Sequence, residues 1–129
     1  MRRLLHNSID TKLGIVFTVG SGALTDDDIR AHQQSLAKNP DFRPNLRQLL
    51  DTRAVTEVKV TPEGVRAAVA GNPFGKGAKR AFVAATETIF GMARMFEQSR
   101  VNPQDEFRVF RSMDEARAWL GLPKEGTAT

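Results

Sequence analysis

Four stretches of this chain of 129 residues carry the signals that begin and end an α-helix. Each starts with a threonine or serine followed by acidic residues, so a hydroxyl can accept a hydrogen bond from the free N–H groups of the first turn. Each ends near a proline or glycine, which interrupts helical backbone. Four helices are therefore predicted between these pairs of signals: Thr25 and Asn39-Pro40, Thr61 and Gly71-Asn72-Pro73, Thr86 and Asn102-Pro103, Ser112 and Gly121-Leu122-Pro123.

Segments with the apolar spacing of β-strands lie before and between these helices. Alternation at Leu13, Ile15, Phe17 and Val19 predicts a strand that ends at Gly20-Ser21-Gly22 and pairs with the segment 5–9 as a hairpin. Further strands are predicted at 46–55, 81–85 and 107–110. The order ββαβαβαβα predicts an α/β fold with a mixed, mainly parallel sheet of four to five strands and four helices. We expect one domain at 1–123 and a flexible tail at 124–129.

The composition excludes several kinds of chemistry. The sequence contains no cysteine and no tyrosine, so disulfides, cysteine nucleophiles and thiolate metal sites are ruled out. His6 and His32 lack a second imidazole or acid at ligand spacing, and we interpret His32 as a hydrogen-bonded histidine at the boundary of the first helix. Consecutive acids at 26–28 point about 100° apart and cannot converge on one ion. No catalytic constellation, metal or cofactor is predicted.

Charge and hydropathy point to a cytoplasmic protein. The formal net charge is +4, but the basic residues are scattered from Arg2 to Lys124. Specific nucleic-acid binding is not expected, because Trp119 is predicted to pack inward and no other aromatic residue offers a clear stacking platform. Apolar runs of three or four residues are far too short to span a bilayer, and no apolar signal-peptide core follows Arg2-Arg3.

Two polar groups are candidate contacts for a ligand or anion. The first is a basic loop with Lys76, Lys79 and Arg80, which fails the spacing of a phosphate-binding loop and is interpreted as a solvated basic tip, with a weak anion contact as the alternative. The second is Asp51 and Arg53, at the end of a strand, where α/β sheets often bind ligands. Alternate strand residues share a face, so we favour a structural ion pair between them.

Met95 is a candidate contact with a partner. Its helical direction separates it from the apolar stripe of the third helix and leaves it beside Gly91 and Gln98. A small residue next to an adaptable apolar side chain suits packing against another subunit or protein. A second covered face within the monomer is the equally weighted alternative.

The element order and several phrases resemble the SpoIIAA-like group of the STAS superfamily, which includes bacterial STAS/SEC14-type proteins of unassigned function. The phrases are Leu49 to Thr56, Thr61 to Gly64, Ser21 to Thr25, Asn72 to Gly75, Ala93 to Glu97 and Val109 to Arg111. The resemblance implies a non-enzymatic domain that binds a partner and is switched by phosphorylation of a serine after the central strand. Thr61 occupies the equivalent position, but Pro62 removes a backbone donor there, and we interpret Thr61 as a helix cap.

The leading hypothesis is a regulatory or protein-interaction module that binds another protein, or itself as a homo-oligomer such as a dimer, through Met95 and the helix starts at Thr61 and Thr86. The alternative is binding of a small apolar or anionic ligand in a pocket, because the wider group also resembles lipid-binding CRAL-TRIO folds. That alternative predicts a sizeable apolar cavity, with Thr86 as a further anion contact. An enzyme that uses Asp51 and Arg53 ranks third.

Overall fold

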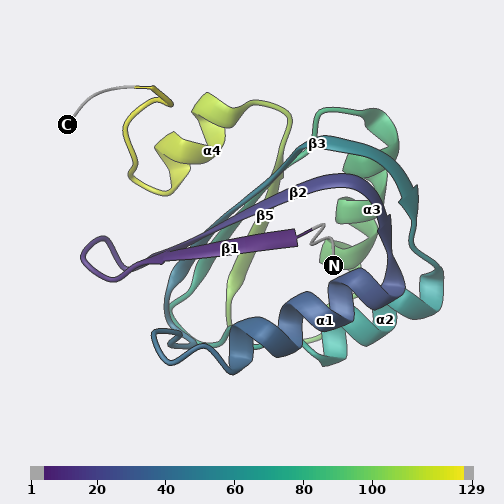
Figure 1. Cartoon of the computed structure of the whole chain (residues 1–129), viewed down its shortest axis with the longest axis horizontal. Coiled ribbons are helices and arrows are strands. Elements are labelled where there is room, and N and C mark those ends of the chain that lie inside the picture. Colours follow the sequence, from purple (N-terminus) through teal and green to yellow (C-terminus); the bar gives the residue numbers. More distant parts are fainter. Residues whose placement is uncertain (1–4, 127–129) are drawn as a thin grey trace.

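The computed structural model describes residues 5–126, which form one five-stranded sheet and four helices (Figure 1). The strands are β1 (Leu5–Asp10), β2 (Ile15–Thr25), β3 (Arg47–Lys59), β4 (Lys79–Val83) and β5 (Glu106–Phe110). The helices are α1 (Asp26–Ala37), α2 (Pro62–Ala70), α3 (Glu87–Gln98) and α4 (Met113–Trp119). The predicted order of elements is therefore confirmed.

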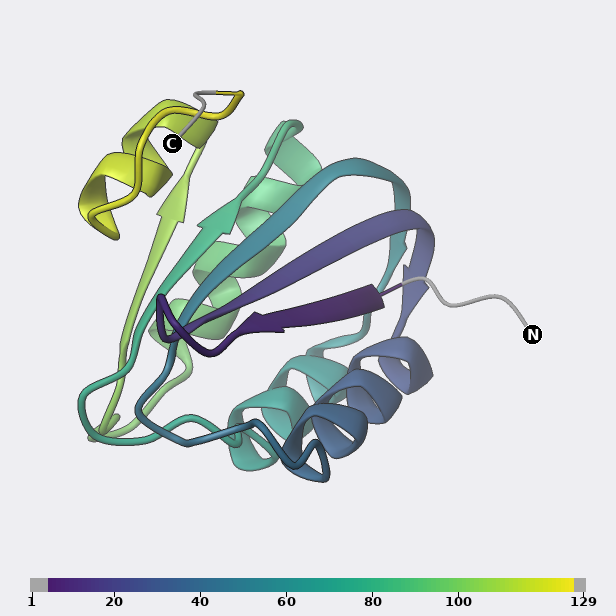
Figure 2. The same cartoon turned by 60° about the vertical axis from the view of Figure 1, so that its left-hand side comes forward.

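The strands lie in the sheet in the order in which they occur in the chain. β1 and β2 are antiparallel, and every later pair is parallel, as predicted. Each parallel crossover moves the chain one strand further in the same direction. Because such crossovers are right-handed, α1, α2 and α3 fall on one face of the sheet, and α4 covers the opposite face (Figure 2).

The four predicted helix starts are confirmed by their hydrogen bonds. The side-chain oxygens of Thr25, Thr61, Thr86 and Ser112 each accept a hydrogen bond from the backbone N–H three residues further along. This contact satisfies one of the N–H groups that have no partner within the helix. Local sequence alone therefore positions all four helices along the chain.

The predicted end of β2 is wrong. β2 continues through Gly20-Ser21-Gly22 to Thr25, and β3 likewise extends beyond the expected position 55 to Lys59. The two strands pair along this whole length, with register shifts between Val19 and Ser21 and between Gly22 and Ala23. Gly22 has φ 69°, so the glycines accommodate irregularities within a long strand instead of ending it.

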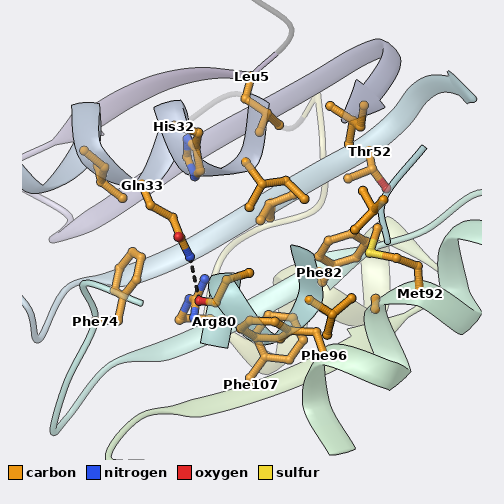
Figure 3. Close-up of a pocket in the computed structure, with 18 of the residues that line it drawn as sticks. Leu5, His32, Gln33, Thr52, Phe74, Arg80, Phe82, Met92, Phe96 and Phe107 are labelled. Carbon is orange, nitrogen blue, oxygen red and sulfur yellow. Dashed lines mark hydrogen bonds between the residues drawn. The ribbon is translucent and has the colours of Figure 1, made fainter. Parts of the chain in front are cut away.

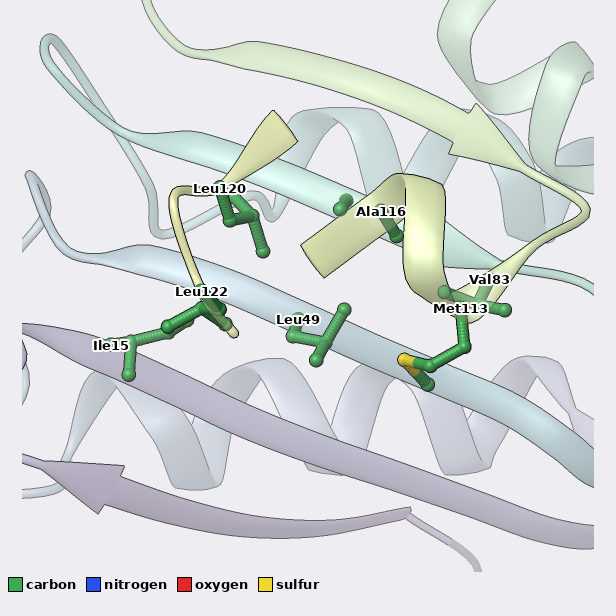
Figure 4. Close-up of a cluster of buried hydrophobic side chains, with 8 residues drawn as sticks. Ile15, Leu49, Val83, Met113, Ala116, Leu120 and Leu122 are labelled. Atoms are coloured by element: carbon green, nitrogen blue, oxygen red, sulfur yellow. The ribbon is translucent and has the colours of Figure 1, made fainter. Parts of the chain in front are cut away.

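The sheet separates two apolar layers. Alternate strand residues face α4, where Ile15, Leu49 and Val83 pack against Met113 and neighbouring side chains of α4 and the segment after it (Figure 4). Phe82 and Leu50 point to the other face, toward α3. Trp119, which was predicted to pack inward, is half-buried at the edge of the first layer. The second layer, beneath three helices, contains the cavity described next.

Candidate functional site

A cavity of about 80 Å³ lies between the sheet and the three helices α1, α2 and α3 (Figure 3). Its walls are mostly apolar. They include Leu5 of β1, Leu36 of α1, Ala68 of α2, Met92 of α3 and Phe82 of β4. Eight of the nine elements contribute a residue to the lining, and α4 does not, so the cavity exists only in the folded chain.

Four polar side chains also line the cavity: His32, Gln33, Thr52 and Arg80. Two of them direct their donors elsewhere, because Thr52 Oγ1 donates to the carbonyl of Val83 at 2.6 Å and Gln33 Nε2 donates to that of Ala68 at 2.8 Å. Figure 3 shows His32 and Arg80 on the same side of the cavity, with Gln33 between them in this view, and Phe82 and Met92 on the other side. The polar end therefore depends on His32 and Arg80.

Arg80 is a buried cation with a residual exposure of 6%. Its Nε donates to Gln48 Oε1 at 2.9 Å, and its Nη1 donates to Asn72 Oδ1 at 3.0 Å and to Asp105 Oδ2 at 3.3 Å. The guanidinium carbon also lies 4.4 Å from the centre of the Phe74 ring. Burial lowers the pKa of Arg80 to about 10 while the charge of Asp105 opposes that shift, so the group is protonated at neutral pH.

A continuous chain of hydrogen bonds joins Arg80 to His32 across four strands. Gln48 Nε2 donates to Thr18 Oγ1 at 2.9 Å, and Thr18 Oγ1 donates to Asn7 Oδ1 at 2.7 Å. Asn7 Nδ2 lies 3.1 Å from His32 Nδ1. Because a guanidinium can only donate, Arg80 fixes the orientation of the Gln48 amide, which then fixes the direction of each later bond.

This chain of bonds determines the tautomer of His32. Asn7 must donate its N–H to His32 Nδ1, so Nδ1 is an acceptor and the ring proton is on Nε2. Burial, together with the charge of Arg80, lowers the pKa of His32 to about 4. His32 is consequently neutral at pH 7, and Nε2 is a hydrogen-bond donor.

Asp105 holds two buried guanidinium groups. It accepts hydrogen bonds from Arg80 and from Arg100, and the exposed fractions of these three side chains are only 2%, 7% and 6% respectively. Asn72 Nδ2 also donates to Asp105 Oδ1 at 3.2 Å. No other carboxylate among the described residues bonds to either guanidinium, so two buried positive charges face one buried negative charge.

The predicted basic loop is divided by the fold. Lys76 is exposed, as expected for a solvated tip. Lys79 begins β4 on the α4 face, where its Nζ donates to the Trp119 carbonyl at 3.2 Å. Arg80 points to the opposite face, so a solvated position is wrong for this residue. Its place next to the apolar run 81–85 is the sequence signal for burial, because Arg80, Phe82 and Ala84 alternate onto one face.

Asp51 and Arg53 form the predicted ion pair on the face of the sheet opposite the cavity. Arg53 Nη2 lies 2.9 Å from Asp51 Oδ2 and 2.6 Å from Glu125 Oε2. Its guanidinium holds the pKa of Glu125 below its usual value. Glu125 belongs to the tail predicted to be flexible, of which residues 127–129 lie outside the described part of the chain. Neither Asp51 nor Arg53 lines the cavity.

Thr61 and Thr86 are exposed helix caps that do not line the cavity. Thr61 Oγ1 donates to Asp26 Oδ2 at 2.6 Å, and this bond lowers the pKa of the Asp26 carboxyl. A carboxylate so close to the hydroxyl would repel an added phosphate. The phosphoacceptor role that the resemblance implies for Thr61 is untested, and its contacts support the role of helix cap.

Met95 lies on the outer surface of α3. It is 44% exposed, so the monomer does not cover it with a second layer. Gly91 and Gln98 are exposed beside it, and nothing lies within 4 Å of the Cβ position at Gly91. The three residues predicted to form a partner surface therefore do share one uncovered strip of helix.

Several residues of the buried network were not predicted from the sequence. They are Asn7, Thr18, Gln48, Asn72, Arg100 and Asp105. Gln48, beside the apolar pair Leu49 and Leu50, carried a readable signal, because a polar residue within a buried strand needs a partner. Within residues 5–126, no three His, Asp or Glu side chains converge as a metal site, and no helix has the length and hydrophobicity needed to cross a membrane.

Comparison with known proteins identifies the fold. The sequence matches no protein-family model and no curated protein. Among solved structures, it is similar to an uncharacterised protein of the DUF3478 family from Shewanella loihica PV-4, described as having a SpoIIAA-like fold, with a TM-score of 0.55 and 16% identity over 90% of this chain and 91% of that chain. The chain has a SpoIIAA-like fold. The expectation from the family phrases is thus confirmed at the level of fold, and the SpoIIAA-like neighbour assigns no activity.

Proposed function

We propose that this SpoIIAA-like domain binds a small, largely apolar ligand in the cavity beneath α1, α2 and α3. The observation that supports the proposal is a cavity with mostly apolar walls whose lining includes His32 and Arg80, each with an N–H that bonds to none of the described residues. Binding sites commonly combine an apolar lining with a few polar groups that orient the ligand. Because of this cavity, we rank the ligand-binding hypothesis above the protein-interaction hypothesis that the sequence favours.

The volume restricts the ligand to a small molecule. A cavity of about 80 Å³ is roughly half the size of the apolar cavity of about 150 Å³ that accommodates benzene in an engineered protein. The pocket is partly open, and a long acyl chain does not fit entirely within it. The pocket is smaller than the sizeable cavity that the lipid-carrier hypothesis predicts, so the proposal is restricted to ligands of which only a short apolar part enters it.

The chemistry of the lining supports binding rather than catalysis. The lone pair of His32 Nδ1 is occupied by Asn7, and the Thr52 hydroxyl donates its proton to a backbone carbonyl rather than to a base, so neither side chain is an activated nucleophile. Arg80 can only donate. The described lining thus holds and orients a ligand without a paired acid and base.

Filling the cavity is expected to abolish ligand binding. In Ala68→Leu, the added carbons occupy the space beside Gln33 and Leu36, whereas Ala67→Leu places the same side chain on the exposed side of α2. Amide ¹H–¹⁵N spectra recorded with xenon or 1-butanol should shift around the cavity in the wild type and in Ala67→Leu, and not in Ala68→Leu. Wild-type spectra without shifts around the cavity, or shifts that persist in Ala68→Leu, would contradict the proposal.

A second candidate function is self-association through α3, supported by the exposure of Met95. The exposed strip of Thr88, Gly91, Met95 and Gln98 carries no charge, so it can face its own copy across a two-fold axis without like-charge repulsion. The small Gly91 would allow the two helices to approach closely. The partner in this candidate is a second copy of the chain.

Replacing Met95 by glutamate is expected to shift a dimer toward the monomer, because two copies of the new carboxylate would meet at the axis. Sedimentation equilibrium over a range of protein concentrations measures the change. Val101→Glu is the matched control, because Val101 is 83% exposed and lies outside α3. A wild-type protein that is monomeric throughout, or a dimer unaffected by Met95→Glu, would eliminate this candidate.

A further inference from the structure

We propose that the ligand of the cavity is a short-chain carboxylate whose anionic group binds between Arg80 and His32 and whose tail fills the apolar part. The inference rests on the proposed function, because it specifies the ligand class for the same cavity. Three features carry it: the donors that face the cavity, the imbalance of buried charge and the size of the apolar space.

The first feature is a pair of uncommitted donors. Nε and Nη1 of Arg80 are used by Gln48, Asn72 and Asp105, whereas Nη2 makes no hydrogen bond to the described residues. No fully buried side-chain nitrogen or oxygen in this part of the chain lacks a partner. Nη2 must therefore reach accessible space, and the cavity lined by Arg80 offers that space.

His32 supplies the second donor. Its Nδ1 is occupied by Asn7, and the fixed tautomer leaves the N–H at Nε2 without a bond to the described residues. The ring lines the same cavity as Arg80 and lies on the same side of it in Figure 3. The amide oxygen of Gln33 lies against Gly71, only 2.7 Å from the position of an added Cβ there, so the N–H groups of Arg80 and His32 are the polar groups offered to a ligand. Two donors match a carboxylate, which has two acceptor oxygens and no donor.

The second feature is the excess of buried positive charge. Arg80 and Arg100 share the single carboxylate of Asp105, and all three side chains are at least nine-tenths buried. The ring of Phe74 offsets part of this excess through its contact with the Arg80 guanidinium. A ligand with one negative charge would balance the remainder, whereas a dianion would bury an additional unpaired charge.

The third feature is the remaining space. Beyond the two donors, the cavity is bounded by side chains such as Leu24, Phe82, Met92 and Ala93. The whole pocket, which is partly open, has a volume of about 80 Å³, roughly half that of the cavity that holds the six carbon atoms of benzene, so the enclosed tail is limited to roughly three carbon atoms. Butyrate is therefore the probe of choice, and butyramide is the neutral molecule of nearly the same shape.

The decisive experiment compares the affinity of the wild-type protein for butyrate, butyramide and inorganic phosphate at pH 7. We expect butyrate to bind at least about tenfold more tightly than butyramide, because hydrogen bonds to a charged group are stronger than neutral ones. Titrations followed by ¹H–¹⁵N spectra of the histidine side chains should also show a shift of the His32 Nε2 signal with butyrate. This comparison needs no substitution in the buried network.

Variants at His32 test the contact separately. His32→Gln retains an acceptor for Asn7 and a donor for the ligand, whereas His32→Leu removes both groups. We expect butyrate affinity to be lost in His32→Leu and largely retained in His32→Gln, with folding of each variant verified by its amide spectrum. A His32→Leu protein that folds and binds butyrate as the wild type does would overturn the role assigned to this residue.

The remaining outcomes separate the two proposals. Equal affinity for butyrate and butyramide, with both lost in Ala68→Leu, would overturn the carboxylate inference and leave the apolar ligand site intact. Phosphate binding as tight as that of butyrate would also overturn the inference, since the tail would then contribute nothing. If none of the four probes binds in the cavity, both the ligand site and the carboxylate inference are overturned. The probes are xenon, 1-butanol, butyrate and butyramide.

Discussion

Replacing Asp105 by asparagine is expected to lower the free energy of unfolding by about 3 to 5 kcal/mol. The asparagine has nearly the same shape, but it leaves the buried guanidinium groups of Arg80 and Arg100 without a counter-charge. Returning those charges to water requires unfolding, because the two arginine side chains are 7% and 6% exposed. The effect therefore arises from uncompensated charge rather than from a change in packing.

Urea denaturation at pH 7, followed by circular dichroism, measures this loss. Asp41→Asn is the matched control, because Asp41 is exposed and its side chain makes no ion pair with the described residues. That variant should change the unfolding free energy by less than about 0.5 kcal/mol. A loss below about 1 kcal/mol in Asp105→Asn would show that the buried cluster is not held together by its carboxylate. Added butyrate should raise the stability of the wild type by mass action if the cavity is its site.

Stability is expected to fall as the pH decreases from about 6.5 to about 4, because of His32. Its folded-state pKa of about 4 lies below the ordinary value of 6.5, so the unfolded chain binds more protons throughout that interval. The stabilisation is fully present above pH 6.5 and is lost progressively as the pH falls toward 4. The difference between these two pKa values corresponds to a loss of up to about 3 kcal/mol in the free energy of unfolding.

His32→Gln should remove most of this slope while keeping a hydrogen-bond partner for Asn7. Urea denaturation of both proteins at intervals from pH 7 to pH 4 measures it, with His6→Gln as the control for loss of an exposed histidine. The carboxyls of Asp26, Asp51, Glu87 and Glu125 have lowered pKa values through their bonds to Thr61, Arg53 or Arg111. The stabilisation from these carboxyls is lost only as the pH falls below the ordinary carboxyl pKa values near 4. It is therefore lost at a lower pH than the stabilisation from His32. An unchanged slope in His32→Gln would contradict the assignment.

Prediction from the sequence was most successful where the determining interactions are local. A hydroxyl that caps a helix acts within four residues, as Thr25 and Thr61 do, so the starts of the helices can be recognised in a short window. The end of β2 was mispredicted because the glycines at 20 and 22 have two meanings. A glycine can end a strand that has no further pairing partner, or it can form an irregularity within a strand that does. Here the pairing partner is a segment of β3 that lies 33 or 34 residues further along the chain.

The candidate site was likewise predictable only where local sequence determines the outcome. Arg80 was singled out by its charge, but its neighbours Lys76 and Lys79 suggested a shared, solvated position. The alternation of β4 separates Arg80 from Lys79, and the parallel register of β3 and β4 places Gln48 opposite Arg80. Neither the partner nor the burial can be deduced from the basic loop alone.

The sequence by itself determined the order of the elements, the starts of the four helices and, through the family phrases, the SpoIIAA-like fold. These features depend on capping, apolar periodicity and chain order, which act over short distances along the chain. The tertiary structure decided that Asn7, Thr18, Gln48, Arg80 and Asp105 form one buried network and that a cavity lies beside it. The reason is physical: strand register aligns polar groups that are 11 to 32 residues apart, and the covering helices exclude the water that would otherwise satisfy them.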